Sequence, residues 1–311
     1  MEFFSHQTSY PFMATRKLWY TLSAVLMVVS LASFFVRGLN LAIDFTGGVN
    51  AEASFPHAVN VEDVRSKLGG AGFLDPQVQN FGSSRDVSIR LPPDPKQTAT
   101  EIRARLEGAL KSLDAGVQVV QLDVVGPQVG GELKLSAVEA LGFTLLGIFL
   151  YIAFRFHTWR LSIGAIFAVL HDPILVLGFF SITQMSFDLA VVAAILAVIG
   201  YSLNDTVVVF DRIRERFEGN RRSPPDVVLD QSINQTLSRT IMTKVVTSIV
   251  VVALLFLGGP VLKGFSEALL IGIIAGTYSS IYISSAIALD FGLTAEHVFP
   301  TVKKAAFDHL P

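Results

Sequence analysis

Six segments of this chain are each long and apolar enough to cross a lipid bilayer, and this feature restricts the fold more than any other. A helix needs about 20 mostly apolar residues to span the hydrocarbon core. Because lipid offers no hydrogen-bond partner to bare backbone, each such segment is expected to be α-helical. The segments run from 18 to 36, 137 to 154, 161 to 182, 187 to 210, 240 to 257 and 265 to 289. The sequence therefore predicts a polytopic α-helical membrane protein with six transmembrane helices.

The composition agrees with this class and excludes several others. Hydrophobic residues make up 51% of the chain and charged residues 16%, whereas about a quarter of a soluble globular domain is charged. The net charge of −2 provides no broad basic field for nucleic acid. The absence of cysteine excludes disulfides, thiolate metal sites and cysteine nucleophiles. Since most of the histidines are far apart in sequence, we expect no metal cluster, no cofactor and no enzymatic activity.

Residues 18–36 have two interpretations, a signal peptide or a membrane anchor. Arg16 and Lys17 supply the positive start that both share. The apolar stretch is longer than the usual core of a signal peptide, and no clear cleavage site precedes Arg37. We therefore expect an uncleaved first transmembrane helix.

The positive charges of the short loops predict the orientation, because Lys and Arg collect on the cytoplasmic side. Among the opposite short loops, only the one between spans five and six has such a charge, Lys263. We therefore expect a cytoplasmic N-terminus over 1–17, a cytoplasmic tail over 291–311 and a periplasmic domain over 37–135. The charges on the predicted cytoplasmic side are Arg16, Lys17, Arg155, Arg160, Arg212, Arg214, Arg216, Arg221, Arg222, Arg239, Lys303 and Lys304.

The outer domain is expected to be an α+β domain between spans one and two, while spans two to six fill residues 136–290. Apolar alternation predicts strands over 49–55, 78–81, 86–91 and 117–125. Capping residues and apolar stripes predict helices over 60–69 and from Thr98 or Thr100 to Leu113. The order β-α-β-β-α-β is typical of the ferredoxin-like fold. Whether the domain is only structural or contacts a substrate stays open, because fold alone does not define function.

Two charges inside or beside the membrane are the main functional candidates. An ionisable group in a bilayer costs about 2.5–3.5 kcal/mol on insertion scales, and such groups mark functional sites. Asp205 lies within span four, where Ser202 shares its helix face and Asn204 lies on an adjacent one. Arg239, at the inner start of span five, is its expected partner. Thr236 lies beside Arg239, and with Gln235 and Thr243 it is predicted to carry a chain of water or hydroxyl groups.

The alternatives to a proton site at Asp205 and Arg239 are a static ion pair that locks two helices, or an arginine that only reaches the interface. Asp172, between His171 and Pro173 in span three, is a further candidate. It either takes part in a proton relay with His171 or makes a structural hydrogen bond between helices. In span six, small residues recur every four positions and predict a surface against which another helix packs. These residues are Gly272, Gly276, Ser280 and Ser284.

Five motifs in order along the chain resemble those of the SecF family of protein-export membrane subunits, within the RND superfamily. The longest, over 199–215, resembles the fourth-span signature of that family, and the resemblance covers residues from about 16 to 299. The motifs are IDFTGG at 43–48, VGPQVG at 125–130, IGYSLNDTVVVFDRIRE at 199–215, NQTLSRT at 234–240 and GGPVLKGF at 258–265.

The resemblance implies a function and partners. Members pair with SecD, each subunit contributing six spans, and the pair associates with the SecYEG channel. YajC is a further expected partner. The pair uses the proton motive force to draw preproteins across the bacterial inner membrane after SecA-driven transport. The family's intramembrane Asp and Arg, both tied to proton flow, match Asp205 and Arg239. Lys244 departs from the pattern where a small polar residue is expected, and Pro173 departs where an aliphatic residue is more common.

The sequence thus supports a proton-coupled cycle and leaves two rivals. In the cycle, Asp205 takes a proton from the periplasmic side and releases it to the cytoplasm, and the helices move the outer domain on the emerging chain. The rivals are a small-molecule efflux subunit of the RND type and a passive assembly factor for SecYEG. Six spans suggest half of a pseudo-symmetric transporter, which favours a proton path at the interface with a partner.

Overall fold

The computed structural model describes residues 8–94, 97–156 and 158–299. His6, His157, His309, Lys303 and Lys304 lie outside the described residues. The outermost parts of the two predicted cytoplasmic ends lie outside them too.

The structure confirms six helices that are long and apolar enough to cross a membrane within the described ranges. The sixth is interrupted by one π-helical turn, η2. In chain order the spans are α1 (Arg16–Arg37), α5 (Pro127–Arg155), α6 (Trp159–Thr183), α7 (Leu189–Gly219), α8 (Pro225–Leu257) and the series α9 (Gly259–Tyr278), η2 (Ser279–Ile283) and α10 (Ser284–Asp290). A 3-10 turn, η1 (Met13–Thr15), precedes the first, and α11 (Ala295–Val298) follows the last.

Several helices extend beyond their apolar segments. α5 begins at Pro127 and α8 at Pro225, and proline suits the first turn of a helix, where its missing N–H has no helical partner. Residues 127–135, which the sequence suggested were part of the outer domain, are therefore the first turns of α5. Polar extensions of this kind carry no hydropathy signal.

The six spans form a bundle in which α6, α7 and the α9–α10 series are mostly buried, whereas α1, α5 and α8 are largely exposed. Small residues let the central helices approach closely. A Cβ atom on Gly272 of α9 would collide with Val198 of α7, and one on Gly178 of α6 would collide with Ser30 of α1. The predicted stripe of small residues on the sixth span is thus a packing surface.

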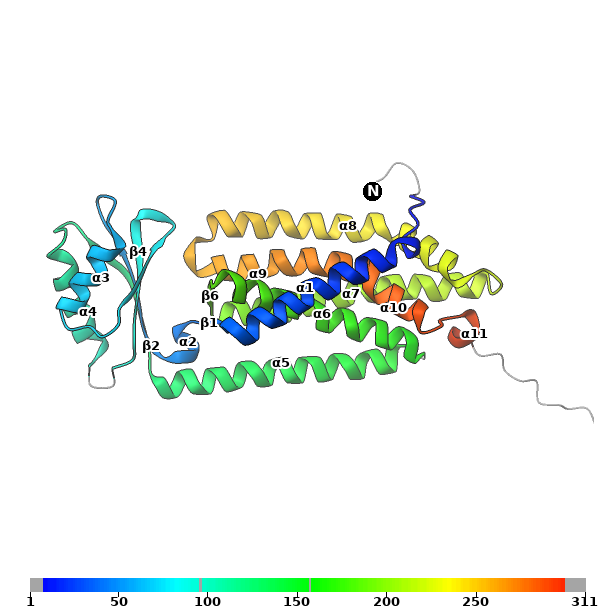
Figure 1. The fold of residues 1–311 in the computed structure, drawn as a ribbon, viewed down its shortest axis with the longest axis horizontal. Helices are drawn as coiled ribbons and strands as arrows, with labels where there is room; N and C mark the ends of the chain where they lie inside the picture. The colour runs from blue at the N-terminus through cyan, green and yellow to red at the C-terminus, as the bar shows by residue number, and fades with distance from the viewer. Residues whose placement is uncertain (1–7, 95–96, 157, 300–311) are drawn as a thin grey trace, which may run out of the picture.

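The sheet domain (residues 48–125) lies beyond one end of this bundle, whereas the Arg16 end of α1 and α11 lie at the opposite end (Figure 1). Its four strands pair in the order β3-β4-β2-β5, and every pairing is antiparallel. This is the ferredoxin-like arrangement that the element order predicted. The elements are β2 (Gly48–Ser54), α3 (Val61–Gly70), β3 (Gln77–Phe81), β4 (Ser83–Leu91), α4 (Ala99–Lys111) and β5 (Gln118–Val125).

Local signals fix the two helices of the sheet domain. Asn60 accepts a hydrogen bond from the backbone N–H of Glu62 and so caps α3. Thr98 and Glu101 form a capping box at the start of α4, which satisfies backbone donors that the first turn leaves free. The apolar sides of both helices cover one face of the sheet and form a core separate from that of the bundle. The other face of the sheet is polar.

Two of the sequence motifs meet where the sheet domain joins the bundle. The first lies on α2 (Ile43–Thr46) and the glycines that follow it. Gly47 and Gly48 have φ values of 70° and 121°, which only glycine adopts easily. A Cβ on Gly130 of α5 would lie 2.8 Å from Gly47 N. The glycines of both motifs therefore let the segment that follows span one pack directly against the first turns of α5.

A second link joins the same region to the third and fourth spans. β1 (Asn40–Leu41), which follows α1, pairs in parallel with β6 (Ser186–Phe187), which precedes α7. The backbone N–H of Leu189, the first residue of α7, donates to Asp44 Oδ2 at 3.0 Å. The start of α7 is thus tied directly to the base of the sheet domain.

Candidate functional site

The ion pair Asp205–Lys244 lies inside the bundle, between α7 and α8. Lys244 Nζ is 2.8 Å from Asp205 Oδ2, and the two side chains are 6% and 7% exposed. At this distance the attraction between the opposite charges holds the pair together. Lys244 Nζ is also 5.7 Å from the ring centre of Tyr201, which lies one turn before Asp205 on α7. The carboxylate, the ammonium and the aromatic ring form one group.

The prediction that Arg239 pairs with Asp205 is wrong. Arg239 is exposed, and no ion pair joins the two side chains within the described ranges. The reason is the rotation of α8, whose buried face carries Thr236, Thr240 and Lys244 at the four-residue spacing that places side chains on one side of a helix. Arg239 falls outside this stripe.

The threonine hydroxyls beside Arg239 bond to the backbone of α8 rather than to one another in the described part of the molecule. Thr236 and Thr243 each donate to a carbonyl of their own helix. Gln235 Oε1 accepts hydrogen bonds from the side chains of Arg212 and Arg216. These hydroxyl and amide groups therefore stabilise α8 and its contact with α7.

Asp172 is the centre of a second polar group, which is enclosed in the bundle. One carboxylate oxygen lies 2.9 Å from His171 Nδ1, and the other accepts hydrogen bonds from Ser202 and, at 3.0 Å, from Ser279. The hydroxyl of Tyr278 lies 2.6 Å from His171 Nε2. Asp172 and His171 are at most 1% exposed. This group joins α6, α7, α9 and the π-helical turn, a type of turn that is frequent at functional sites.

The group around Asp205 and the group around Asp172 both include side chains of α7, but not the same ones. Ser202, predicted to accompany Asp205, donates to Asp172 instead, and Asn204 is exposed. Pro173 leaves α6 continuous from Trp159 to Thr183.

Lys244 was not predicted from the sequence as the partner of Asp205. The signal that would have found it is the four-residue repeat that Thr236 and Thr240 begin.

The missed residues around Asp172 are Tyr278 and Ser279. Their span shows only a stripe of small residues in the sequence, and nothing in the chain order indicates that Tyr278 and Ser279 come close to Asp172. Among the described residues, no group of three or more histidine, aspartate and glutamate side chains has the arrangement of a metal site.

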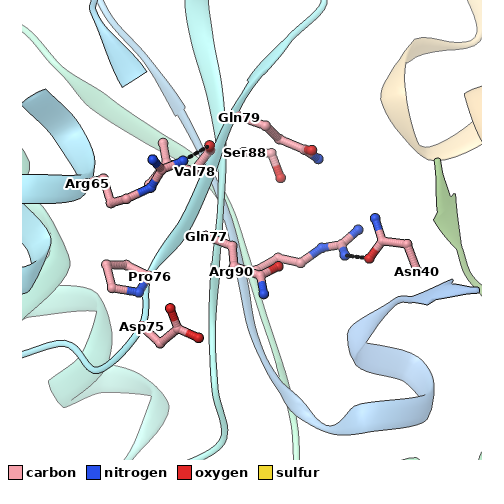
Figure 2. Close-up of a pocket in the computed structure, with 9 residues that line it drawn as sticks. All are labelled: Asn40, Arg65, Asp75, Pro76, Gln77, Val78, Gln79, Ser88 and Arg90. Atoms are coloured by element: carbon pink, nitrogen blue, oxygen red, sulfur yellow. Dashed lines mark hydrogen bonds between the residues drawn. The ribbon is translucent and has the colours of Figure 1, made fainter. Parts of the chain in front are cut away.

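A polar cleft of about 380 Å³ lies along β3 and β4 of the sheet domain and reaches Asn40 of β1. Figure 2 shows Arg90 of β4 extending from the sheet towards Asn40. Arg90 Nη1 donates to Asn40 Oδ1 at 3.1 Å, and Nη2 donates to the hydroxyl of Ser186. Asn40 and Ser186 are opposite each other in the β1–β6 pair. Arg90 therefore ties the sheet domain to both strands of the β1–β6 pair.

A neighbouring cleft of about 290 Å³ on the same polar face is lined by several carboxylates, among them Glu52 and Asp123. Partial burial, together with Asp123 and Asp86, raises the pKa of Glu52 above its ordinary value. In contrast, hydrogen bonds from Ser54 and Ser83 hold the pKa of Asp86 below its ordinary value. This face of the sheet thus carries closely spaced negative charges.

The fold and the site define a class: a polytopic α-helical membrane protein with charged side chains enclosed among its spans and a ferredoxin-like domain at one end. The family model "Protein export membrane protein SecD/SecF, C-terminal" matches residues 105–294, and the "SecD/SecF GG Motif" matches residues 32–55. The chain therefore belongs to the SecD/SecF family of protein-export membrane proteins, as its motifs indicated.

The relatives that match along nearly the whole chain are SecF subunits. The protein translocase subunit SecF of Haemophilus influenzae is 47% identical over 96% of this chain and 91% of its own length. That of Vibrio alginolyticus is 44% identical over 96% of both. The chain is a SecF-type subunit of a protein translocase.

A solved structure agrees with this assignment. The crystal structure of SecDF, a translocon-associated membrane protein from Thermus thermophilus, matches with a TM-score of 0.83 and 37% identity. The match covers 91% of this chain but only 39% of that SecDF chain. The present chain thus corresponds to less than half of that protein.

Proposed function

We propose that this subunit uses the proton motive force to promote the movement of preproteins across the membrane, with Asp205 as the group that takes up and releases the proton. The observation that carries the proposal is the burial of the Asp205 carboxylate between α7 and α8. A charge in that position is costly and is kept where it moves ions or protons. One charge crossing 100 mV releases about 2.3 kcal/mol, which is enough to drive a change in helix packing.

The route from Asp205 to the sheet domain runs along α7. Protonation of Asp205 removes the negative charge that attracts Lys244 and so weakens the contact between α7 and α8. The far end of α7 is attached to the base of the sheet domain through Leu189 and Asp44 and through the contact of Arg90 with Ser186. A shift of α7 therefore moves the sheet domain, which acts on the emerging polypeptide.

The proposal includes the cellular setting that the family relationship supports. The subunit pairs with SecD, and the pair works with SecYEG, with YajC and, after the ATP-driven step, with SecA. It lies in the bacterial inner membrane with both termini in the cytoplasm and the sheet domain in the periplasm. The proposed cycle makes and breaks no bond of the transported chain, so it requires no enzymatic activity. Asp172 and its hydrogen-bonded neighbours serve as a second polar centre that the moving helices share.

The test compares Asp205→Asn with wild type in membrane vesicles that contain the complete complex. We expect Asp205→Asn to abolish both proton flux and proton-dependent export, because asparagine keeps the shape but binds no proton. Asp211→Asn is the matched control, since Asp211 lies on the same helix but pairs with Arg155 and is 42% exposed. Normal flux and export in Asp205→Asn, at normal subunit levels, would show a passive assembly role instead.

A further inference from the structure

Lys244 has a role that a proton cycle through Asp205 alone does not explain. An ammonium group in an apolar interior is costly unless a charge partner compensates for it, yet Lys244 is 5% exposed. We propose that Lys244 is a built-in counter-ion that competes with the proton for the carboxylate of Asp205. In this role it sets the pH at which the site works and keeps metal cations out. The inference rests on the proposed function of Asp205.

The competition follows from the geometry of the pair. The ammonium lies 2.8 Å from Oδ2 of the carboxylate that would take up the proton. Protonation forms an O–H bond on Asp205, leaves every N–H bond of Lys244 intact and cancels the negative charge that holds the ammonium. The reverse step returns the proton and restores the pair. Lys244 is therefore a positioning residue, which acts on the proton through Asp205.

A second resting place for the ammonium is already present. The ring of Tyr201 is 5.7 Å from Lys244 Nζ, and the face of an aromatic ring attracts cations. The Tyr201 hydroxyl lies 3.0 Å from Thr247 Oγ1, a contact that fixes the ring between α7 and α8. When Asp205 is protonated, the ammonium moves from the carboxylate to this ring.

The other titratable groups near α7 are occupied elsewhere. On α6 and α9, His171, Asp172 and Tyr278 bind one another. Within the described residues, the charges that act on Asp205 are those of Lys244 and, more weakly, Arg239, both on α8. The pH response of the site is therefore expected to depend mainly on Lys244.

The same contact explains why a metal cation would not replace the proton. The carboxylate of Asp205 is the group that a cation such as Na⁺ would have to bind in order to replace the proton. The ammonium already lies against Oδ2, so a metal ion would also meet a positive charge. A proton meets the same positive charge, but it forms a covalent O–H bond with one lone pair, and this bond compensates for the repulsion.

The experiment measures proton flux in vesicles that contain the complete complex, as a function of pH, with and without added NaCl. In Lys244→Met we expect the pH of half-maximal flux to rise by about one to three units, because a neighbouring cation favours the charged form of a carboxylate by that amount. Lys244→Arg keeps the charge and should keep the wild-type profile. Lys244→Ser serves as a second neutral variant, and in it NaCl should inhibit proton flux, whereas wild type should be unaffected.

The outcomes separate this inference from the proposed function. Loss of flux in Asp205→Asn together with wild-type pH profiles in both neutral Lys244 variants would overturn the counter-ion role and leave the function of Asp205 standing. Normal flux in Asp205→Asn would overturn both. A shift in Lys244→Met or Lys244→Ser that Lys244→Arg does not show supports the inference, since a merely structural role would change subunit levels without moving the pH profile.

Discussion

Two neighbouring glycines at the start of α5 provide a sharp test of how the sheet domain joins the bundle. Gly130 is buried, and a Cβ added to it would lie 2.8 Å from Gly47 N and 3.3 Å from Phe45 C. Gly131 is exposed, and a Cβ there would meet no atom within 4 Å. Both residues are in the same helix, so a change to alanine alters their backbone preference equally.

The magnitude follows from these contacts. Gly→Ala within a helix stabilises it by about 1 kcal/mol, and Gly131→Ala should show this gain. In Gly130→Ala the added methyl group must displace the backbone of the GG motif, and overpacking of this kind costs about 1–3 kcal/mol. Gly130→Ala should therefore be less stable than Gly131→Ala by about 1–3 kcal/mol.

The assay is thermal unfolding of the purified full-length protein in detergent at one fixed heating rate, followed by tryptophan fluorescence. Trp19 and Trp159 lie in the spans α1 and α6, so the signal reports on the bundle. Limited proteolysis of the sheet domain provides a second readout. Equal melting temperatures for the two variants, or a higher one for Gly130→Ala, would refute the close contact between the two motifs.

Three further predictions concern the polar groups. Asp172→Asn should lower the stability by about 1–3 kcal/mol, because it leaves buried donors without their acceptor; an unchanged melting temperature would contradict an enclosed network. Arg90→Ala should accelerate amide hydrogen exchange at β1 and β6, whereas the control Arg65→Ala should not, since Arg65 donates to Glu62 and to the carbonyl of Val78, both within the sheet domain. Equal exchange in the two variants would show that Arg90 is not the link. Glu52→Gln should raise the melting temperature at pH 7 but not at pH 4. Glu52 has a raised pKa in the folded protein, so its ionisation destabilises the fold above that pKa and the penalty disappears as the pH falls through it. A gain of the same size at both pH values would argue against charge repulsion.

Much of the architecture was predictable because it depends on local patterns. The six spans follow from the length of the apolar segments, and the ferredoxin-like domain follows from strand alternation and from the caps at Asn60 and Thr98. Helix boundaries were less predictable, since the polar first turns of α5 and α8 lack an apolar signal. Even so, Pro127 and Pro225 mark the positions at which these two helices begin.

The candidate site was predictable in part. The presence of a carboxylate within span four was evident from the sequence, and the structure shows that Asp205 is buried. Its partner was not evident, because Arg239 and Lys244 are both cations in the middle of α8. Only the rotation of the helix distinguishes them, and that rotation results from the packing of its buried side chains against α7 and α9.

The sequence by itself thus determined the number of spans, the fold of the inserted domain, the family and the carboxylate at the centre of the site, because each depends on a residue or a short pattern. The tertiary structure decided which cation meets that carboxylate, which groups surround Asp172 and where the two glycine motifs touch. Each of these contacts joins residues from different helices, and the register and rotation that bring them together are set by the packing of the whole bundle.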